Sequence, residues 1–137
     1  MVLHRVASAA VLLSLSLLSV VPPAQADKRP TVVELFTSQG CSSCPPADAL
    51  LGELERRGGV IALGFHISYW DSLGWKDPFS RPQSTERQRV YARLFSGQIY
   101  TPQLVVDGRY GFVGSDGREA SSAIHSAIRE RKIPIAI

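Results

Sequence analysis

The sequence has 137 residues, a mild net charge of +3 and only two cysteines. This length accommodates one compact domain whose core needs no disulfide staple. The Lys and Arg residues form no basic block, which excludes a nucleic-acid-binding arm and predicts no nucleic-acid partner. Both cysteines lie in Cys41-Ser42-Ser43-Cys44, which excludes a small disulfide-rich scaffold because such scaffolds spread more cysteines along the chain.

The first 26 residues have the features of a secretory signal peptide. Arg5 supplies positive charge, Val6 to Val21 is an apolar run, and Ala24-Gln25-Ala26 is a small-x-small cleavage site. A membrane anchor is the alternative, but the run is shorter than the ~20 predominantly apolar residues of a spanning helix. We therefore expect residues 1–26 to be a signal peptide and residues 27–137 to be the mature domain. The protein is then periplasmic or secreted, with no membrane span after cleavage.

The first part of the mature chain predicts a βαβ unit. Thr31 to Phe36 is a β-branched and aromatic run typical of a buried strand. Apolar residues at helical spacing follow, namely Ala47, Leu50, Leu51 and Leu54, and Gly58-Gly59 ends that helix. Val60 to Ile67 is a second strand-like run, so the two strands are predicted to be parallel.

A long irregular stretch, Ser68 to Gln83, comes next. Loops of this length inside a compact domain are usually functional. Its aromatic residues, Tyr69, Trp70, Trp75 and Phe79, form either a peptide-binding lip or a cap on the core. The helix that follows is predicted to have Ser84 as its N-cap and to end before Gly97. Its predicted apolar face consists of Val90, Tyr91, Leu94 and Phe95.

The last part of the domain predicts a hairpin and a helix. Gln103 to Val106 and Tyr110 to Val113 flank Asp107-Gly108, which is the strongest short signal for a type I′ turn. Ser115 or Asp116 caps the last helix. Its predicted apolar stripe is Ala120, Ala123, Ile124, Ala127 and Ile128. The predicted order is β-α-β-α-β-β-α.

The Cys41–Cys44 spacing is typical of a disulfide-exchange centre. Such a centre needs one exposed thiol that is partly thiolate and a second thiol that resolves the mixed disulfide. A helix N-terminus supplies free N–H groups and a positive dipole end, which lower a thiol pKa. We assign Cys41 as the attacking thiol and Cys44 as the resolving thiol. An inert disulfide and a metal site with His66 or His125 are the alternatives.

Thr101-Pro102 is the second candidate feature, because Pro102 directly precedes a predicted strand. Proline in sheets occupies a strand's first residue or an edge, and an X-Pro bond can be cis at small cost. A cis bond would turn the Thr101 backbone outward, towards a peptide partner. An ordinary trans proline at the strand start is the alternative.

Together these features resemble the thioredoxin superfamily, an α/β fold with a central mixed sheet flanked by helices. More narrowly, Glu34-Leu-Phe-Thr-Ser-Gln-Gly-Cys-Ser-Ser-Cys-Pro-Pro-Ala-Asp48 resembles a family of secreted bacterial thioredoxin-like proteins of unknown function. The segments 66–71, 74–79 and 100–103 also match the pattern of that family. The resemblance implies redox positions for Cys41 and Cys44, a cis-proline position for Pro102 that faces them, and thiol-disulfide exchange as in the wider superfamily.

Two departures from the pattern affect these expectations. Pro45-Pro46 follows Cys44, and proline suits a helix's first turn but disrupts its interior. The helix is therefore predicted to start at Pro45 or Pro46, with Cys41 just outside it, so that the Cys41 pKa falls less. In addition, family members usually continue with more β-rich sequence, whereas this sequence stops at Ile137. This indicates a short variant or a truncated product.

Several polar residues are candidates for supporting roles. Glu34 lies in an otherwise apolar strand, where a carboxylate is costly unless it is paired. It either relays protons for Cys44, or forms a salt bridge or occupies an edge position. His66 either stabilises a thiolate, binds a metal or is structural. Asp71 and Asp77 are predicted to cap the loop.

The sequence therefore predicts a periplasmic or secreted thiol-disulfide oxidoreductase that needs no cofactor. The predicted site residues are Cys41, Cys44, Thr101, Pro102 and Glu34. The expected partners are protein thiols and disulfides as substrates, together with a redox partner protein. The alternatives are a copper or zinc chaperone that uses Cys41, Cys44 and His66, and a non-catalytic binding module. The Ser-Ser pair between the cysteines does not indicate whether the protein oxidises, reduces or isomerises.

Overall fold

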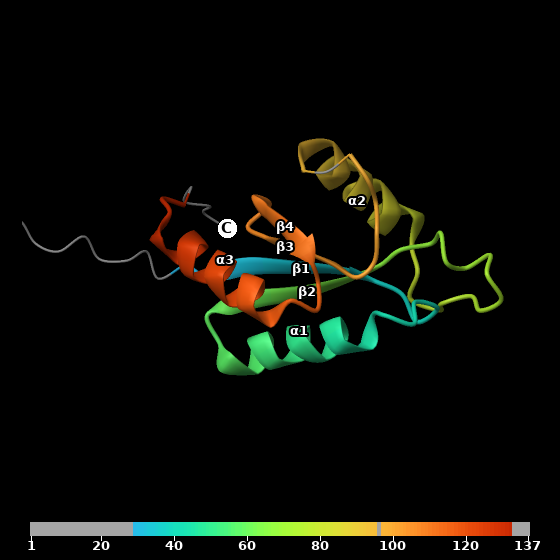
Figure 1. Ribbon diagram of the computed structural model, residues 1–137, viewed down its shortest axis with the longest axis horizontal. Helices are drawn as coiled ribbons and strands as arrows, with labels where there is room; N and C mark the ends of the chain where they lie inside the picture. The colour runs from blue at the N-terminus through green and yellow to red at the C-terminus, as the bar shows by residue number, and fades with distance from the viewer. Residues whose placement is uncertain (1–28, 96, 133–137) are drawn as a thin grey trace, which may run out of the picture.

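The computed structural model describes residues 29–95 and 97–132, so the predicted signal peptide lies outside the described residues. The elements are β1 (Thr31–Thr37), α1 (Pro45–Arg57), β2 (Val60–His66), α2 (Pro82–Leu94), β3 (Gln103–Val106), β4 (Tyr110–Val113) and α3 (Gly117–Arg129). Their order confirms the α/β, thioredoxin-like fold class (Figure 1). None of the helices in the described part of the chain is long and apolar enough to span a bilayer.

The four strands form one mixed sheet in the order β2-β1-β3-β4. β1 pairs with β2 in parallel and with β3 in antiparallel orientation, so Leu35 lies between Gly64 and Leu104. Asp107 and Gly108 have φ values of 46° and 68° between β3 and β4. A type I′ turn requires positive φ at both central residues, which confirms the hairpin predicted from this dipeptide.

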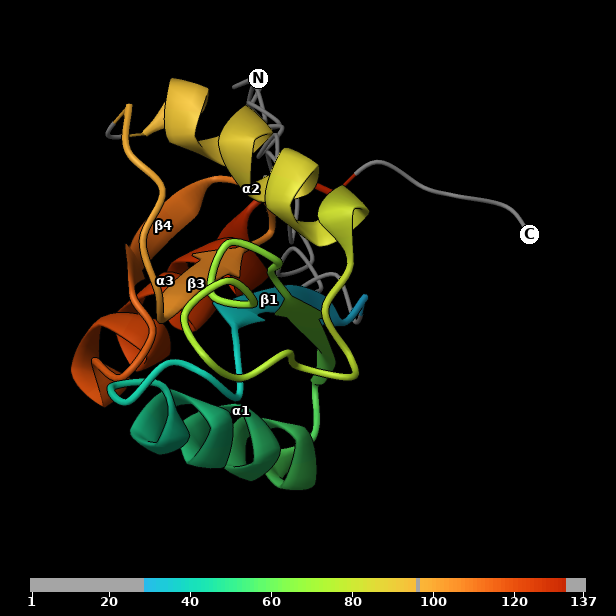
Figure 2. The same cartoon turned by 90° about the vertical axis from the view of Figure 1, so that its right-hand side faces the viewer.

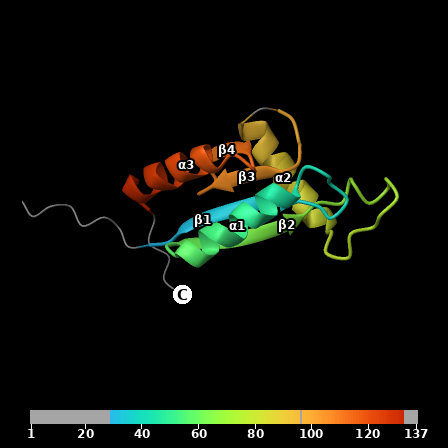
Figure 3. The same ribbon diagram turned by 60° about the horizontal axis from the view of Figure 1, so that its bottom comes forward.

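The helices cover the two faces of the sheet unequally. α1 and α3 lie side by side on one face, and α2 lies on the other (Figure 1, Figure 3). The larger core, between the sheet and α1 and α3, contains Val33, Leu35, Ala47, Leu54, Leu104, Val106, Ala120, Ala123 and Ala127. A smaller core on the α2 face contains Phe36, Ile67 and Val105. Because side chains alternate along a strand, Glu34 and Phe36 point towards α2, away from α1.

α2 differs most from its prediction. It begins at Pro82 with Arg81 as N-cap, not with Ser84, because a proline at the first helical position loses no hydrogen bond. Val90 and Leu94 were expected in the core but are 48% and 66% exposed. The buried side chains are instead Ser84, Thr85, Gln88 and Ala92. Polar residues occupy this face because they form hydrogen bonds with the neighbouring loops. Gln88 Nε2, for example, donates to the Tyr100 carbonyl at 2.6 Å.

The other two helices begin where the sequence predicts. α1 starts at Pro45 with Cys44 as N-cap. Asp116 caps α3 and accepts hydrogen bonds from the backbone N–H groups of Arg118 and Glu119. The alanines of the α3 stripe are buried, but Ile128 is 39% exposed, so that part of the predicted stripe is wrong. Small alanines let α3 lie close to the sheet, and Ile128 falls at the edge of the contact.

Candidate functional site

Cys41 and Cys44 form a disulfide between the end of β1 and the start of α1, with their Cα atoms 5.4 Å apart. Tight turns hold the segment, since the Cys41 N–H donates to the Ser38 carbonyl and the Cys44 N–H donates to the Cys41 carbonyl. Cys41 lies outside the helix, as predicted from Pro45-Pro46. The pair therefore occupies the carboxyl end of the sheet, where sites of open α/β folds gather.

The first turn of α1 offers few backbone donors to a thiolate. Pro45 and Pro46 have no N–H, and the N–H groups of Ala47 and Asp48 both donate to the Cys44 carbonyl, at 2.8 and 3.1 Å. A side chain supplies the nearest observed alternative, because Ser43 Oγ lies 3.5 Å from Cys41 Sγ. Ser43 is not expected in this role from the sequence, although its place between the two cysteines is a signal that points to it.

Both cysteines are buried in the disulfide form. Cys41 is 2% exposed and Cys44 is 0% exposed, so the expectation of an exposed Cys41 is wrong for this state. A neighbouring loop lies beside the preceding residue, because a Cβ atom at Gly40 would be in van der Waals contact with Trp70 Cβ, at 3.4 Å. Attack on the disulfide therefore requires local opening of the surrounding segments.

Thr101 and Pro102 lie beside the start of α1. Their peptide bond is cis, as the resemblance implies. A Cβ atom at Gly114 would lie 3.1 Å from Pro102 Cβ and 3.2 Å from Ala47 Cβ, so Pro102 and the first turn of α1 are neighbours. Thr101 Oγ1 accepts a hydrogen bond from Trp70 Nε1 at 2.8 Å. The segments that carry these residues gather at the end of the molecule that faces the viewer in Figure 2.

Asp77 joins the loop of residues 68–81, hereafter the aromatic loop, to the segment before the cysteines. Asp77 is 1% exposed. Asp77 Oδ2 accepts from the Gln39 N–H at 2.8 Å and lies 2.6 Å from His66 Nδ1, and Oδ1 accepts from the Phe79 N–H at 2.9 Å. Burial acts to raise the pKa of Asp77, but the hydrogen bonds from His66, Gln39 and Phe79 outweigh burial and hold the pKa below its ordinary value. Asp77 caps its loop as predicted, and it also fixes a residue close to Cys41.

His66 has an observed structural partner in Asp77. The Phe79 ring packs edge-on against the imidazole, with ring centroids 5.4 Å apart. Within residues 29–95 and 97–132, no group of three or more His, Cys, Asp or Glu residues is placed to hold a metal ion. A thiolate-stabilising role for His66 stays a prediction.

Glu34 lies on the α2 face and forms an ion pair. Its carboxylate is 3% exposed and accepts from Arg87 Nε at 2.7 Å and Arg87 Nη2 at 2.6 Å, as well as from the Tyr91 hydroxyl at 3.1 Å. The hydrogen bonds to Glu34 hold the pKa of Arg87 above its ordinary value. These contacts support the salt-bridge interpretation. A proton relay to Cys44 has no observed contact, because α1 covers the opposite face.

Comparison with known proteins shows the family to which the chain belongs. Residues 32–137 match a family described as "Protein of unknown function (DUF1223)". The chain belongs to this family. A structural genomics crystal structure of a protein from Agrobacterium tumefaciens is 42% identical, with a TM-score of 0.69. The match covers 77% of this chain and 47% of that chain, so this chain spans about half the length of the solved structure. No curated protein matches the chain.

A buried polar network of this DUF1223 domain was not foreseen from the sequence. Gln88 is 0% exposed; its Nε2 donates to Gln103 Oε1 at 3.0 Å, and its Oε1 accepts from the Tyr69 hydroxyl at 3.1 Å. The network connects α2, the aromatic loop and the strand after Pro102. Glutamine in a helix is usually a surface residue, so no local signal in the sequence indicates that Gln88 is part of a buried network.

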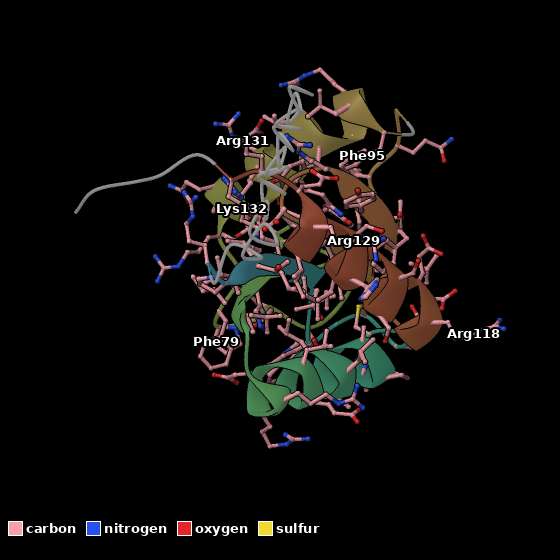
Figure 4. All side chains as sticks on the ribbon, turned by 90° about the vertical axis from the view of Figure 1, so that its left-hand side faces the viewer. Phe79, Phe95, Arg118, Arg129, Arg131 and Lys132 are labelled. Atoms are coloured by element: carbon pink, nitrogen blue, oxygen red, sulfur yellow. A yellow bond between two sulfur atoms is a disulfide. The ribbon has the colours of Figure 1, made fainter. Side chains whose placement is uncertain are left out.

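A groove on the α2 face of the DUF1223 domain lies apart from the disulfide. Its volume is about 520 Å³, and its lining includes Glu34, Arg87, Asp107 and Lys132. These charges are paired within the domain, Arg87 with Glu34 and Lys132 with Asp107. Figure 4 shows Lys132 beyond one end of α3, whereas Arg118 lies at the other end. Neither cysteine lines the groove, so it is not part of the candidate site.

Proposed function

We propose that this DUF1223 domain is a thiol-disulfide oxidoreductase that acts through Cys41 and Cys44 outside the cytoplasm. One observation carries the proposal: the Cys41–Cys44 pair at the start of α1 lies at the same end of the fold as the cis Thr101-Pro102 segment. The signal-peptide pattern of residues 1–26 supports a periplasmic or secreted location. The proposed substrates are protein thiols and disulfides, and a redox partner protein restores the starting state.

The proposed exchange proceeds through a mixed disulfide with the partner. The Cys41 thiolate attacks one sulfur of a partner disulfide, and the other partner sulfur leaves as a thiolate. The Cys44 thiolate then attacks the Cys41 sulfur, which forms the Cys41–Cys44 bond and releases the second partner thiolate. Two electrons pass from the domain to the partner. The reverse sequence oxidises a partner dithiol.

Exchange with oxidised glutathione tests the proposal. Reduced wild-type protein is expected to convert one oxidised glutathione into two reduced molecules for each Cys41–Cys44 bond formed, as counted by mass spectrometry. Cys41→Ser and Cys44→Ser are matched controls, because each retains one thiol and cannot complete the cycle. A wild-type rate no higher than that of free cysteine would contradict the proposal.

A further inference from the structure

We propose that exposed apolar side chains of the aromatic loop bind the polypeptide on which the cysteines act. The inference rests on the proposed function and names its substrate class: an extended polypeptide with an apolar side chain and acidic residues near its cysteine. Leu73, Trp75 and Phe79 are 70%, 58% and 61% exposed. These three side chains, all from one loop, are called the apolar patch below.

Internal hydrogen bonds hold the loop that presents the patch. The Leu73 N–H donates to the Trp70 carbonyl at 3.0 Å, and the Ser80 N–H donates to the Asp77 carbonyl at 3.1 Å. The Asp71 carboxylate accepts from the Asp77 N–H at 3.2 Å and from Ser80 Oγ at 2.5 Å. The exposure of the patch is therefore not the result of a loosely packed loop. A surface that is already ordered loses less entropy when a partner binds.

The patch is attached to the segment that leads to the cysteines. Trp75 Nε1 donates to Gln39 Oε1 at 3.3 Å, and Phe79 packs against His66. Asp77 binds both of these supporting residues, through the Gln39 N–H and His66 Nδ1. Figure 2 shows the aromatic loop and the β1–α1 connection at the same end of the molecule. A polypeptide whose cysteine reaches the disulfide is therefore within reach of the patch.

The charges of the aromatic loop favour an acidic partner. Lys76 and Arg81 are exposed, and neither side chain has a hydrogen-bond or ion-pair partner among the residues that the structure describes. The two carboxylates of the loop, Asp71 and Asp77, are used in hydrogen bonds within the domain. Of the charged side chains of the loop, only Lys76 and Arg81 are exposed, because Asp71 is half-buried and Asp77 is buried. A polypeptide fits better than a membrane, because the neighbouring cysteine pair reacts with thiols and disulfides, which a lipid surface lacks.

Two disulfide substrates separate docking from chemistry. One is a disulfide-linked peptide with leucine and phenylalanine flanked by glutamates, and the other is oxidised glutathione, which has no apolar side chain. For the triple variant Leu73→Ser/Trp75→Ser/Phe79→Ser, the ratio of the two kcat/KM values, peptide over glutathione, is expected to fall about 10-fold or more. A ratio within about two-fold of wild type would overturn the proposal.

Two further variants make the test specific. Val90→Ser/Leu94→Ser removes exposed apolar groups from α2 and is expected to leave the ratio unchanged; an equal fall in this control would overturn the proposal. Lys76→Glu/Arg81→Glu keeps the apolar patch and is expected to lower kcat/KM for the glutamate peptide while raising it for a matched lysine peptide. The same preference for both peptides as in wild type would contradict the assignment of an acidic partner.

Failure of docking is distinguishable from failure of the proposed function. If wild type exchanges with glutathione but the triple variant keeps the wild-type ratio of kcat/KM values, the docking surface is rejected and the oxidoreductase proposal stands. If no substrate reacts, the oxidoreductase proposal fails, and fluorescence anisotropy of a cysteine-free glutamate peptide then decides the docking. Binding to wild type that the triple variant loses supports the surface, and equal or absent binding overturns it. Patch-dependent sedimentation with phosphatidylglycerol vesicles would assign the surface to a membrane and also overturn it.

Discussion

Replacing Asp77 with Asn tests whether one buried carboxylate holds the two loops of the site together. The oxygens of Asp77 receive hydrogen bonds from Gln39, Phe79 and His66. Asparagine has a single acceptor oxygen, so its NH₂ group faces a donor. A hydrogen bond to a charged group contributes about 1.5–3 kcal/mol, and an unsatisfied buried donor costs about 1–3 kcal/mol. We expect Asp77→Asn to lower the free energy of unfolding by about 2–4 kcal/mol at neutral pH.

The effect of this substitution depends on pH with a defined sign. Because the pKa of Asp77 is lowered in the folded protein, the unfolded chain binds the proton more tightly. The stability that the carboxylate contributes is therefore complete above the unfolded pKa, about 3.9, and is lost as the pH falls through the folded value. The difference between wild type and Asp77→Asn should shrink below about pH 4.

Urea unfolding followed by circular dichroism measures both effects. Asp116→Asn is the matched control, because asparagine is as good an N-cap as aspartate and the α3 cap is retained. A cost of less than about 0.5 kcal/mol for Asp77→Asn at neutral pH, the range of ordinary surface substitutions, would show that the carboxylate does not hold the two loops together. The same cost at neutral and acidic pH would also show this.

Four further substitutions probe the site and its supports. Gly114→Ala places a Cβ 2.8 Å from Leu35 Cδ1 and should cost about 1–3 kcal/mol in urea unfolding, whereas Gly52→Ala should not destabilise. Trp70→Ala should speed reduction of the disulfide by dithiothreitol several-fold, because it removes the indole whose Nε1 ties the aromatic loop to Thr101, and an unchanged rate counts against this. Ser43→Ala should slow alkylation of reduced Cys41 about 3–10-fold, with Ser42→Ala as the unaffected control. Glu34→Gln breaks the ion pair with Arg87 and should lower the free energy of unfolding by about 1–3 kcal/mol; the cost is limited because the Arg87 side chain is half exposed. The pH profile of exchange should not change, and a shifted profile would restore the proton-relay interpretation.

The features that the sequence predicts correctly are those with local causes. Asp107-Gly108 predicts its hairpin because two adjacent residues must adopt positive φ. Pro45-Pro46 predicts the start of α1 because a helix tolerates proline only in its first turn. The parallel pairing of β1 and β2 follows from two apolar runs joined by a helix.

The features that escape prediction depend on partners distant in the chain. Glu34 and Arg87 are separated by 53 positions, and Gln39 and Asp77 by 38, so no local pattern indicates either contact. The buried face of α2 is polar because Gln88 binds groups in the loops below it, and helical periodicity detects only apolar faces. The contact of Trp70 with Gly40, 30 positions earlier in the chain, likewise has no local signal.

The identity of the cysteine that first captures a partner decides whether Cys41 is the attacking thiol. Reduced Cys44→Ser and Cys41→Ser variants are mixed with oxidised glutathione, and the intact mass of each is followed over time. Cys41 lies in the connection before α1, between the exposed Ser42 and the loop at Gly40, whereas Cys44 is the fully buried N-cap. We therefore expect Cys44→Ser to gain one glutathione rapidly and Cys41→Ser to gain it slowly. Equal rates, or faster capture by Cys44, would show that Cys41 is not the attacking thiol.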